Sequence, residues 1–372
     1  MYYTAATQDQ LIVVSVLIVN YFSFALTVRA IRSVLSDLPS AQIIVVENSD
    51  DAVEAMSLLA ILPRGVKLIV AQSNLGFGRA CNLALNYSHG EWIFLLNPDA
   101  IVLPGCLEKL IETLQCHPHA GAVSPVAQWD QAATFLLPPG QMQSPTWEWM
   151  LSLGERVPPI GRRLSKSFRK WALQCLYAAN PVSQRMLSGG HMLLSRQAIN
   201  ESGGLFDPSF FMYYEDTDLC RRLLAAGFQL LIDPRARVVH EWRNDPGKNR
   251  FVPDSRRRYL EKHFPHTWFT DRCRLKLEQS WPTRPINQNL LNLGACASPP
   301  SFELPADQNG DWLLELSLNP LFIPAAYSKD SAPPSISPHV GALLGPGQYW
   351  ARVTSSSEKE RLFTWKIPNH LS

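Results

Sequence analysis

The regular pattern of this chain begins with the stretch LIVVSVLIVN, residues 11–20. Nearly every residue in it is apolar and many are β-branched, which favours a strand buried on both faces within a parallel sheet. The run is too short to span a bilayer, and it is not placed like the apolar segment of a secretory signal. We therefore expect a core strand that ends at Asn20, and no membrane-spanning segment.

Segments of strand and helix character alternate through the N-terminal two-thirds of the chain. Strand-like runs cover residues 11–20, 42–47, 66–71, 92–97 and 121–126, and helical spacing covers residues 24–38, 76–88 and 103–115. Strands separated by helix-length segments form βαβ units. The fold class that we predict is α/β with a mostly parallel central sheet, whose ligands bind beyond the carboxyl ends of the strands.

The composition is typical of a globular protein. Of the 372 residues, 46% are hydrophobic and 18% charged, and this length predicts two domains or one large domain with an appendage. The net charge of +2 argues against nucleic acid as a partner. The seven cysteines are scattered without a Cys-x-x-Cys pair, which is typical of reduced thiols, so we expect a cytoplasmic location.

Polar residues follow four of the expected strands. The strand ends carry Asn20, Glu47-Asn48-Ser49, Asn74 and Asn97-Pro98-Asp99. Each of them alone is an ordinary turn residue, but together they line one edge of a parallel sheet. The first strand is not followed by Gly-x-Gly-x-x-Gly, and the chain has no Walker loop, so a Rossmann dinucleotide site and a P-loop are not expected.

A glycine-containing segment, residues 74–82 (NLGFGRACN), opens a helix after the third strand. Glycine permits close backbone approach, and the start of a helix offers free N–H groups, so a nucleotide or a sugar fits there. A tight turn between strand and helix is the other interpretation.

Three acids lie within four positions in the stretch YYEDTDLCRR, residues 213–222. The tyrosines and leucines around them favour burial, so Glu215, Asp216 and Asp218 are expected at a junction between core and cleft. A carboxylate in such a place can act as a general base. Asp216 or Asp218 can instead cap the helix that follows, although one cap does not require three acids.

At this point the chain resembles glycosyltransferase family 2, and within it the rhamnosyltransferase-like members. The resemblance covers roughly residues 11–270. It rests on an ordered set of motifs: Asn20-Tyr21, Glu47-Asn48-Ser49, Asn74-Leu75-Gly76-Phe77-Gly78, Leu96-Asn97-Pro98-Asp99-Ala100, Ser188-Gly189-Gly190, Gly203-Gly204-Leu205-Phe206-Asp207, Tyr214-Glu215-Asp216-Thr217-Asp218-Leu219 and His240.

The resemblance implies a GT-A fold and an inverting transfer, with a nucleoside diphosphate sugar as donor and a saccharide or lipid-linked saccharide as acceptor in cell-surface polysaccharide assembly. Rhamnose is one candidate sugar. It implies a divalent metal, Mg or Mn, held by Asp99 and His240, and Asp216 as general base with Glu215 beside it. The donor contacts that it implies are Asn20, Glu47, Asn48, Asn74, Gly76, Arg79, Asn97, Gly189 and Gly190.

The chain departs from the family pattern at two positions. Asn97 stands where many members have the first aspartate of a pair, which leaves one carboxylate at the metal. Glu47 stands where aspartate is common at the nucleotide. These departures keep a non-catalytic nucleotide-sugar or glycan-binding protein open as an alternative. A nucleotidyltransferase, which also has an α/β nucleotide site with metal carboxylates, is a second alternative. His240 also has a structural interpretation, as a strand-end histidine bonded to a backbone carbonyl.

Residues 127–187 do not continue the pattern of the sheet and form an insertion. Basic residues from Arg162 to Lys170 alternate there with apolar ones in a basic amphipathic pattern, which extends over residues 162–176. One interpretation places this segment against an anionic membrane surface, on the inner face of the cell membrane. The other is a helix packed on the protein with its charges in water.

The composition changes near residue 275. We expect a GT-A domain over residues 1–275, a proline-rich linker over 276–300, and a β-rich, sandwich-like module of unknown role over 301–372. Short extended runs at 312–318, 321–323, 349–353 and 362–367 supply its strands.

Overall fold

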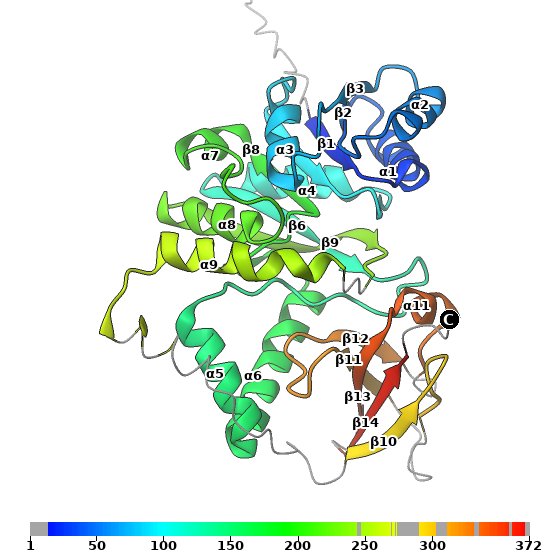
Figure 1. Ribbon diagram of the computed structural model, residues 1–372, viewed down its shortest axis with the longest axis vertical. Helices are drawn as coiled ribbons and strands as arrows, with labels where there is room; N and C mark the ends of the chain where they lie inside the picture. Colours follow the sequence, from blue (N-terminus) through cyan, green and yellow to red (C-terminus); the bar gives the residue numbers. More distant parts are fainter. Residues whose placement is uncertain are drawn as a thin grey trace, which may run out of the picture.

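The computed structural model describes residues 14–243, 247–268, 270–271, 273, 290–302, 311–330, 335–356 and 359–368. Within this part, two sheets organise the molecule (Figure 1). The part of the opening stretch before Val14 lies outside the described residues, as does most of the expected linker.

The larger sheet has nine strands in the order β3-β2-β1-β4-β8-β6-β9-β5, with β7 paired to β9. Its strands β1 to β4 are mutually parallel, and β6 is parallel to β9. The expected α/β architecture is thereby confirmed. The strands are β1 Val14–Asn20, β2 Gln42–Glu47, β3 Lys67–Val70, β4 Trp92–Leu96, β5 Ala100–Val102, β6 Ala120–Gln128, β7 Val182–Gln184, β8 His191–Ser195 and β9 Gln229–His240.

Helices cover both faces of this sheet, which explains why β1 is buried at every residue. Val14, Val16 and Ile18 pack toward α1 and α4, whereas Leu17 and Val19 pack toward α3, α7 and α8. The helices are α1 Phe24–Asp37, α2 Ala52–Ile61, α3 Phe77–Leu85, α4 Cys106–Cys116, α7 Arg196–Glu201, α8 Glu215–Ala225 and α9 Val252–His263. Helix α2 was not among the helices expected from the sequence.

The second sheet contains five strands in the order β10-β14-β13-β11-β12. The β-rich character of the C-terminal part is confirmed, although the described strands form one sheet covered by helices on its two faces. Residues 321–323 do not form a strand. The elements are β10 Leu290–Ala295, β11 Trp312–Ser317, β12 Ala326–Asp330, α11 Pro338–Leu343, β13 Gly347–Ser355 and β14 Glu360–Ile367. The boundaries at residues 275 and 300 stay predictions.

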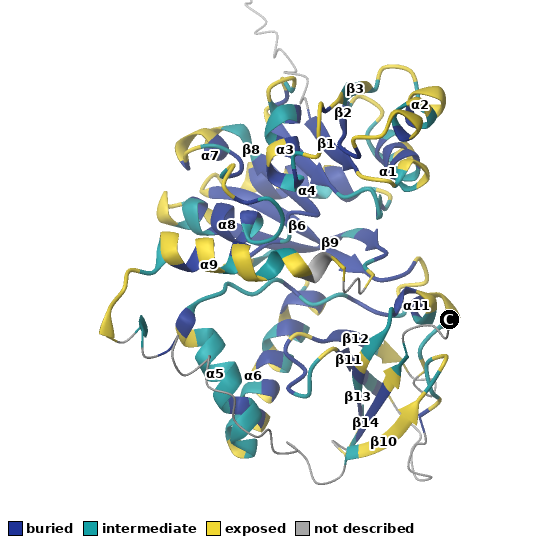
Figure 2. Ribbon diagram, in the orientation of Figure 1, coloured by how far each residue is buried: buried dark blue, intermediate teal, exposed yellow. Residues whose placement is uncertain are grey.

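The insertion attaches the second sheet to the first. It contains α5 (Pro145–Arg156) and α6 (Pro158–Tyr177). Helix α11 covers one face of the second sheet, and α6 packs on the other through a shared apolar cluster that includes Phe168 and Tyr327. In Figure 2 the buried side of α6 faces the second sheet. The C-terminal module therefore shares part of its core with the insertion.

A buried ion cluster accompanies this packing. Glu315 of β11 is fully buried and pairs with Arg352 of β13 and with Arg169 of α6, the latter at 2.6 Å. Arg169 also pairs with Glu360 of β14 at 2.9 Å. The expectation that Arg169 faces a membrane surface is therefore wrong, because this side chain is turned onto the second sheet. The described helices include none that is long and apolar enough to cross a membrane.

Candidate active site

The carboxyl ends of β1 and β2 are held together by buried polar side chains. Asn20 donates to Glu47 and, at 2.9 Å, to Glu54 of α2, and its carbonyl accepts from Thr27 at 2.6 Å. The second oxygen of Glu47 accepts from the backbone N–H of Ser49 at 2.6 Å. The polar groups of Asn20 and Glu47 thus bond to neighbouring residues, and these bonds hold the ends of β1 and β2 in place. A direct contact of either residue with a donor stays a prediction.

The next pair of strand ends forms a second polar unit. The amide of Asn48 contacts Asn74 at 3.2 Å, and its carbonyl accepts from the N–H of Leu75 at 2.8 Å. Gly76 precedes α3 with φ +77°, and a Cβ there would overlap the carbonyl oxygen of Phe211. Glycine is required at this position for both reasons. The structure therefore brings Asn48, Asn74 and Gly76 together at the start of α3.

Arg79 lies one turn farther along α3. Its Nε donates to the carbonyl of Pro208 at 2.7 Å, and the side chain is exposed. This bond ties α3 to the loop before α8. A role for Arg79 in donor binding stays a prediction.

Asp99 and His240 lie opposite each other at the end of the sheet. Ala100 of β5 pairs with His240 of β9 in an antiparallel ladder, which places Asp99 next to the imidazole. The Nε2 of His240 is 3.4 Å from Oδ1 of Asp99. His240 is nearly buried, whereas Asp99 is partly exposed. The pair expected from the resemblance is therefore close in space.

His191 packs edge-on against His240, with ring centroids 5.4 Å apart. Its Nδ1 lies 3.0 Å from the hydroxyl of Ser124. Burial, with the nearby His240 as a second cause, lowers the pKa of His191 to about 3. This ring is therefore neutral at physiological pH and can support His240 without adding charge.

The turn Ser188-Gly189-Gly190 lies between the pair Asp99 and His240 and the acidic motif at the start of α8. The backbone carbonyl of Gly190 accepts from the N–H of Asn97 at 2.8 Å. A Cβ on Gly190 would lie 2.8 Å from the amide of Asn97 and 3.4 Å from Cε1 of His240. A Cβ on Gly189 would lie 3.2 Å from Cβ of Asp216. These side chains thus bound the space beside the turn, and the methyl group of an alanine at Gly189 or Gly190 would fill that space.

A strained backbone presents Asp216. Tyr213 and Tyr214 have φ values of +70° and +66°, an unusual conformation for non-glycine residues, immediately before α8. Asp216 is in the first turn of α8, and its Oδ2 accepts from the N–H of Gly189 at 3.2 Å. Burial raises the pKa of Asp216, although hydrogen bonds from Gly189 and Thr217 oppose the shift. A raised pKa makes this carboxylate a better proton acceptor.

Glu215 has a different environment from its neighbour. Its side chain is buried, and its Cβ is 3.7 Å from where a Cβ on Gly78 would lie. Burial raises the pKa of Cys81 in α3, and the charge of Glu215 is a second cause. Within the described residues, Oε2 of Glu215 has no hydrogen-bond partner. Burial, reinforced by the charge of Asp216, raises the pKa of Glu215. Glu215 therefore packs toward α3 beside Asp216.

Asp218 is the third acid of the motif and has a structural role. It is fully buried and accepts from Arg222 at 2.8 Å, Lys262 at 2.6 Å and His263 at 2.7 Å. Burial alone would raise its pKa, but these hydrogen bonds, that of His263 first, lower it to about 2. A carboxylate held in this way is a poor base, so Asp216 is the better candidate.

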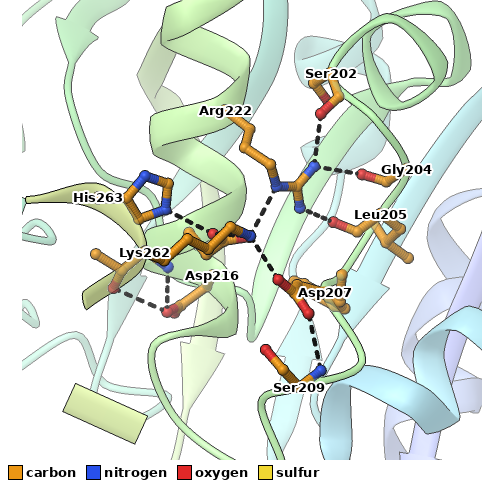
Figure 3. Close-up of polar contacts among 12 residues, drawn as sticks. Ser202, Gly204, Leu205, Asp207, Ser209, Asp216, Arg222, Lys262 and His263 are labelled. Atoms are coloured by element: carbon orange, nitrogen blue, oxygen red, sulfur yellow. Dashed lines mark hydrogen bonds and ion pairs between the residues drawn. The ribbon is translucent and has the colours of Figure 1, made fainter. Parts of the chain in front are cut away.

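Figure 3 shows Arg222, Lys262 and His263 of this cluster together with Ser202, Gly204 and Leu205 of the loop before α8. The guanidinium of Arg222 donates to the carbonyls of Ser202, Gly204 and Leu205, and Lys262 of α9 also pairs with Asp207. The cluster thereby fixes α8 against the loop and α9, which holds Asp216 in place. The N-cap residue of α8 is Tyr214, and no side chain forms a capping hydrogen bond there. Neither Asp216 nor Asp218 therefore caps this helix.

The residues at Asp99 and His240 fit a divalent cation. Two ligands that each lie about 2.1 Å from one cation at a right angle are about 3 Å apart, close to the observed separation of 3.4 Å. The described residues contain no cluster of three or more acidic, histidine or cysteine ligands. A cation at this pair would therefore need oxygen ligands from its substrate or from water.

Three features of the site were not recognised in the sequence. Glu54 orders Asn20 and also accepts from the N–H of Phe24 at 2.9 Å. His191 supports His240, and its position directly after the Gly189-Gly190 turn is a signal that was available. The partners of Asp218 come from α9, and no local pattern connects them to it.

The buried Glu215 should make stability depend on pH. An acid with a raised pKa in the folded state contributes stability below its unfolded pKa, and this contribution is lost as pH rises through the folded value. We expect Glu215→Gln to have a higher Tm than the unchanged protein at pH 9, by at least about 2 °C, and no advantage at pH 5. Calorimetry at both pH values measures the difference, with the exposed Glu201→Gln as control. Equal Tm values at pH 9 would contradict the buried, uncompensated position of Glu215.

Part of the chain resembles a known protein family. Residues 15–175 match the sequence model of Glycosyl transferase family 2. A relative from Mycobacterium tuberculosis (strain H37Rv), named N-acetylglucosaminyl-diphospho-decaprenol L-rhamnosyltransferase, is 29% identical over 200 residues, which cover 50% of this chain and 61% of the relative. The relative in strain CDC 1551 matches with the same values. The alignment thus spans about three-fifths of these relatives.

Solved structures of glycosyltransferases also resemble this chain. The structure of GalNAc-T7 with UDP, GalNAc and Mn²⁺ has a TM-score of 0.46 at 16% identity and covers 76% of this chain and 60% of its own. The mannosyltransferase PcManGT from Pyrobaculum calidifontis, with GDP-Man and Mn²⁺, has a TM-score of 0.44 at 15% identity, with coverages of 73% and 66%.

Proposed function

We propose that this protein is an inverting glycosyltransferase that moves a sugar from a nucleoside diphosphate sugar to a saccharide or lipid-linked saccharide in cell-surface polysaccharide assembly. The observation that carries the proposal is the turn Ser188-Gly189-Gly190, which brings Asp216 to one side and the pair Asp99 and His240 to the other. A single displacement needs a base for the attacking hydroxyl on one side of the sugar and a pair of residues that stabilises the leaving anion on the other.

In the proposed reaction, Asp216 accepts the proton of the acceptor hydroxyl as its oxygen attacks the anomeric carbon. The new carbon–oxygen bond forms while the bond from that carbon to the diphosphate breaks, and the nucleoside diphosphate leaves with the electron pair. Asp99 and His240 would hold Mg²⁺ or Mn²⁺, which would neutralise charge on the departing diphosphate. Asn48, Asn74 and Gly76 bound the space for the nucleotide, and Asn97, Gly189 and Gly190 that for the sugar.

The identity of the acceptor is supported by the mycobacterial relatives, whose name specifies a rhamnosyl transfer to a lipid-linked N-acetylglucosamine. A nucleoside diphosphate rhamnose as donor and a saccharide linked to a lipid diphosphate as acceptor are therefore the first substrates to test. The main alternative is a non-catalytic protein that binds nucleotide sugars. The raised pKa of Asp216 and its partly exposed position beside Gly189 favour the catalytic interpretation.

The donor requirement is tested by measuring Tm with a panel of nucleoside diphosphate sugars, each with Mn²⁺, with Mg²⁺ and with a chelator. We expect one donor to raise Tm by several degrees, and only with the metal, because a ligand at about 100 times its Kd stabilises by about 2.7 kcal/mol. Stabilisation that is equal with the chelator would contradict metal-assisted donor binding, and no stabilisation by any donor would contradict the function.

A cytoplasmic location with peripheral membrane contact is part of the proposal. Arg163, Lys166 and Lys170 of α6 are exposed, unlike Arg169. Each would contribute roughly 1 kcal/mol near an anionic surface. We expect reversal of these three charges to reduce sedimentation with anionic vesicles at low salt by at least about tenfold. Equal sedimentation of both proteins would contradict the contact.

A further inference from the structure

A cavity of about 370 Å³ lies between the catalytic site and the C-terminal module. Its lining includes Ser188, His191 and His240 from the site, Trp129 just after β6, and Leu316 and Tyr349 from the second sheet. This volume is within the range of pockets that bind small ligands. Because both parts of the chain contribute walls, the cavity requires the module.

Apart from Gln184, whose Oε1 has no hydrogen-bond partner among the described residues, the walls away from the catalytic site offer few hydrogen bonds to a ligand. The indole N–H of Trp129, the hydroxyl of Tyr349 and the hydroxyl of Ser317 each donate to a backbone carbonyl, at 2.8, 2.6 and 2.7 Å. The side chain of Asn319 likewise bonds to the backbone of its own loop, at 2.8 Å. A sugar buried against these groups would lose bonds to water without replacement, at a cost of about 1–3 kcal/mol for each polar group. An apolar chain has no such cost.

One end of the cavity joins the candidate active site. Ser188 precedes Gly189, whose backbone contacts Asp216, and His240 faces Asp99. Asn48 and Asn74, which bound the expected nucleotide space, do not line the cavity. A ligand can therefore occupy the cavity on the acceptor side of the site while the nucleotide space remains free.

The segment 137–140 forms a wall of the cavity, and Leu318 lies at its opening. Leu136 and Tyr327 exchange two backbone hydrogen bonds, at 2.7 and 2.9 Å, which fasten the wall segment 137–140 to the second sheet. Leu318 also lines the cavity and is 42% exposed, so it marks the opening to solvent. Trp242 lines the cavity as well, and the next residue, Arg243, is exposed.

We propose that this cavity binds the hydrocarbon chain of a lipid-linked acceptor, with the acceptor's phosphate toward His240 at the end that joins the candidate active site. The inference rests on the proposed function and names a binding site for its acceptor. It also gives the C-terminal module a role, because the module supplies one wall of the chain-binding site.

Calorimetry on the full-length protein tests the proposal with inorganic diphosphate, geranyl diphosphate and farnesyl diphosphate, each with a chelator and below its micellar concentration. We expect farnesyl diphosphate to bind at least about tenfold more tightly than geranyl diphosphate, since each buried methylene adds affinity. Inorganic diphosphate should bind most weakly. Equal affinities of the three probes, or no binding by any of them, would overturn the proposal.

Leu318→Asp places a charge at the opening of the cavity without disturbing the core. We expect it to weaken farnesyl diphosphate binding at least about tenfold at an unchanged Tm. The matched control is Leu291→Asp on β10, where the leucine is 48% exposed and does not line the cavity. Similar losses in both variants, or in neither, would place the chain elsewhere.

Donor titration with Mn²⁺ separates this inference from the proposed function. It is carried out on the unchanged protein, on Leu318→Asp and on Leu291→Asp. If the donor binds but geranyl and farnesyl diphosphate bind with equal affinity, the cavity assignment is refuted and the function stays intact. Chain binding that responds to Leu318→Asp, together with no binding of any donor, would refute the function and retain a lipid site.

Discussion

Replacing Asp216 by asparagine is expected to lower turnover by about 10²–10⁴-fold, the effect typical of a lost general base. Asparagine keeps the shape of the side chain, and its carbonyl can still accept from the N–H of Gly189, so the fold and donor binding should persist. The reduction should appear in kcat. Initial rates of sugar transfer at saturating donor measure it.

The neighbouring acids supply the controls for this variant. Glu215→Gln should affect the chemical step much less, because Glu215 packs toward α3. Asp218→Asn should lower the free energy of unfolding first, because Arg222, Lys262 and His263 lose a shared charged partner. Two results together would show that the base is Asp218. Asp216→Asn would keep a rate within a few-fold of that of the unchanged protein, and Asp218→Asn would be folded but inactive.

Replacing Asp99 by alanine is expected to abolish the metal-dependent part of donor binding. The chain offers one carboxylate and one imidazole at this pair, so loss of the carboxylate removes the only anionic ligand that the pair supplies. Changes to residues that merely support a metal ligand cost about 10–100-fold in affinity, so loss of the ligand itself should cost more than about 100-fold. Calorimetric titration of the donor with and without Mn²⁺ measures the difference.

His240→Ala should weaken the same binding to a smaller extent, since a neutral imidazole contributes less charge than a carboxylate. Ser124→Ala is the matched control, because the Ser124 hydroxyl bonds to His191, one residue farther from the pair, and to the carbonyl of Pro125, and contacts neither Asp99 nor His240 through a hydrogen bond. Metal-dependent affinity that is unchanged in Asp99→Ala would contradict the assignment of this pair.

The catalytic half of the fold could be predicted because its signals are local. The buried run of β1 and the polar strand ends at Asn48, Asn74 and Asp99 each depend on a few neighbouring residues. Helix α2 was missed because its apolar residues do not share one buried face: Val53, Met56 and Leu59 are exposed, and only Leu58 joins the core. The helical periodicity that a sequence can show was therefore weak.

The remaining errors concern contacts between distant parts of the chain. Arg169 belongs to a basic amphipathic pattern, and only its pairing with Glu315 shows that it faces the second sheet. The three acids of α8 look alike in sequence, whereas the structure turns Glu215 toward α3, pairs Asp218 with α9 and leaves Asp216 beside Gly189. Such differences depend on tertiary packing, which propensity and spacing do not encode.

The central claim is that Asp216 and Asp99 act on opposite sides of one turn, the first on the acceptor and the second on the departing diphosphate. The most direct measurement compares donor affinity with Mn²⁺ and the single-turnover rate in Asp216→Asn and Asp99→Ala. The account predicts that Asp216→Asn binds donor as the unchanged protein does and fails in the chemical step, whereas Asp99→Ala loses metal-dependent donor binding. Donor binding lost in Asp216→Asn and retained in Asp99→Ala would contradict it.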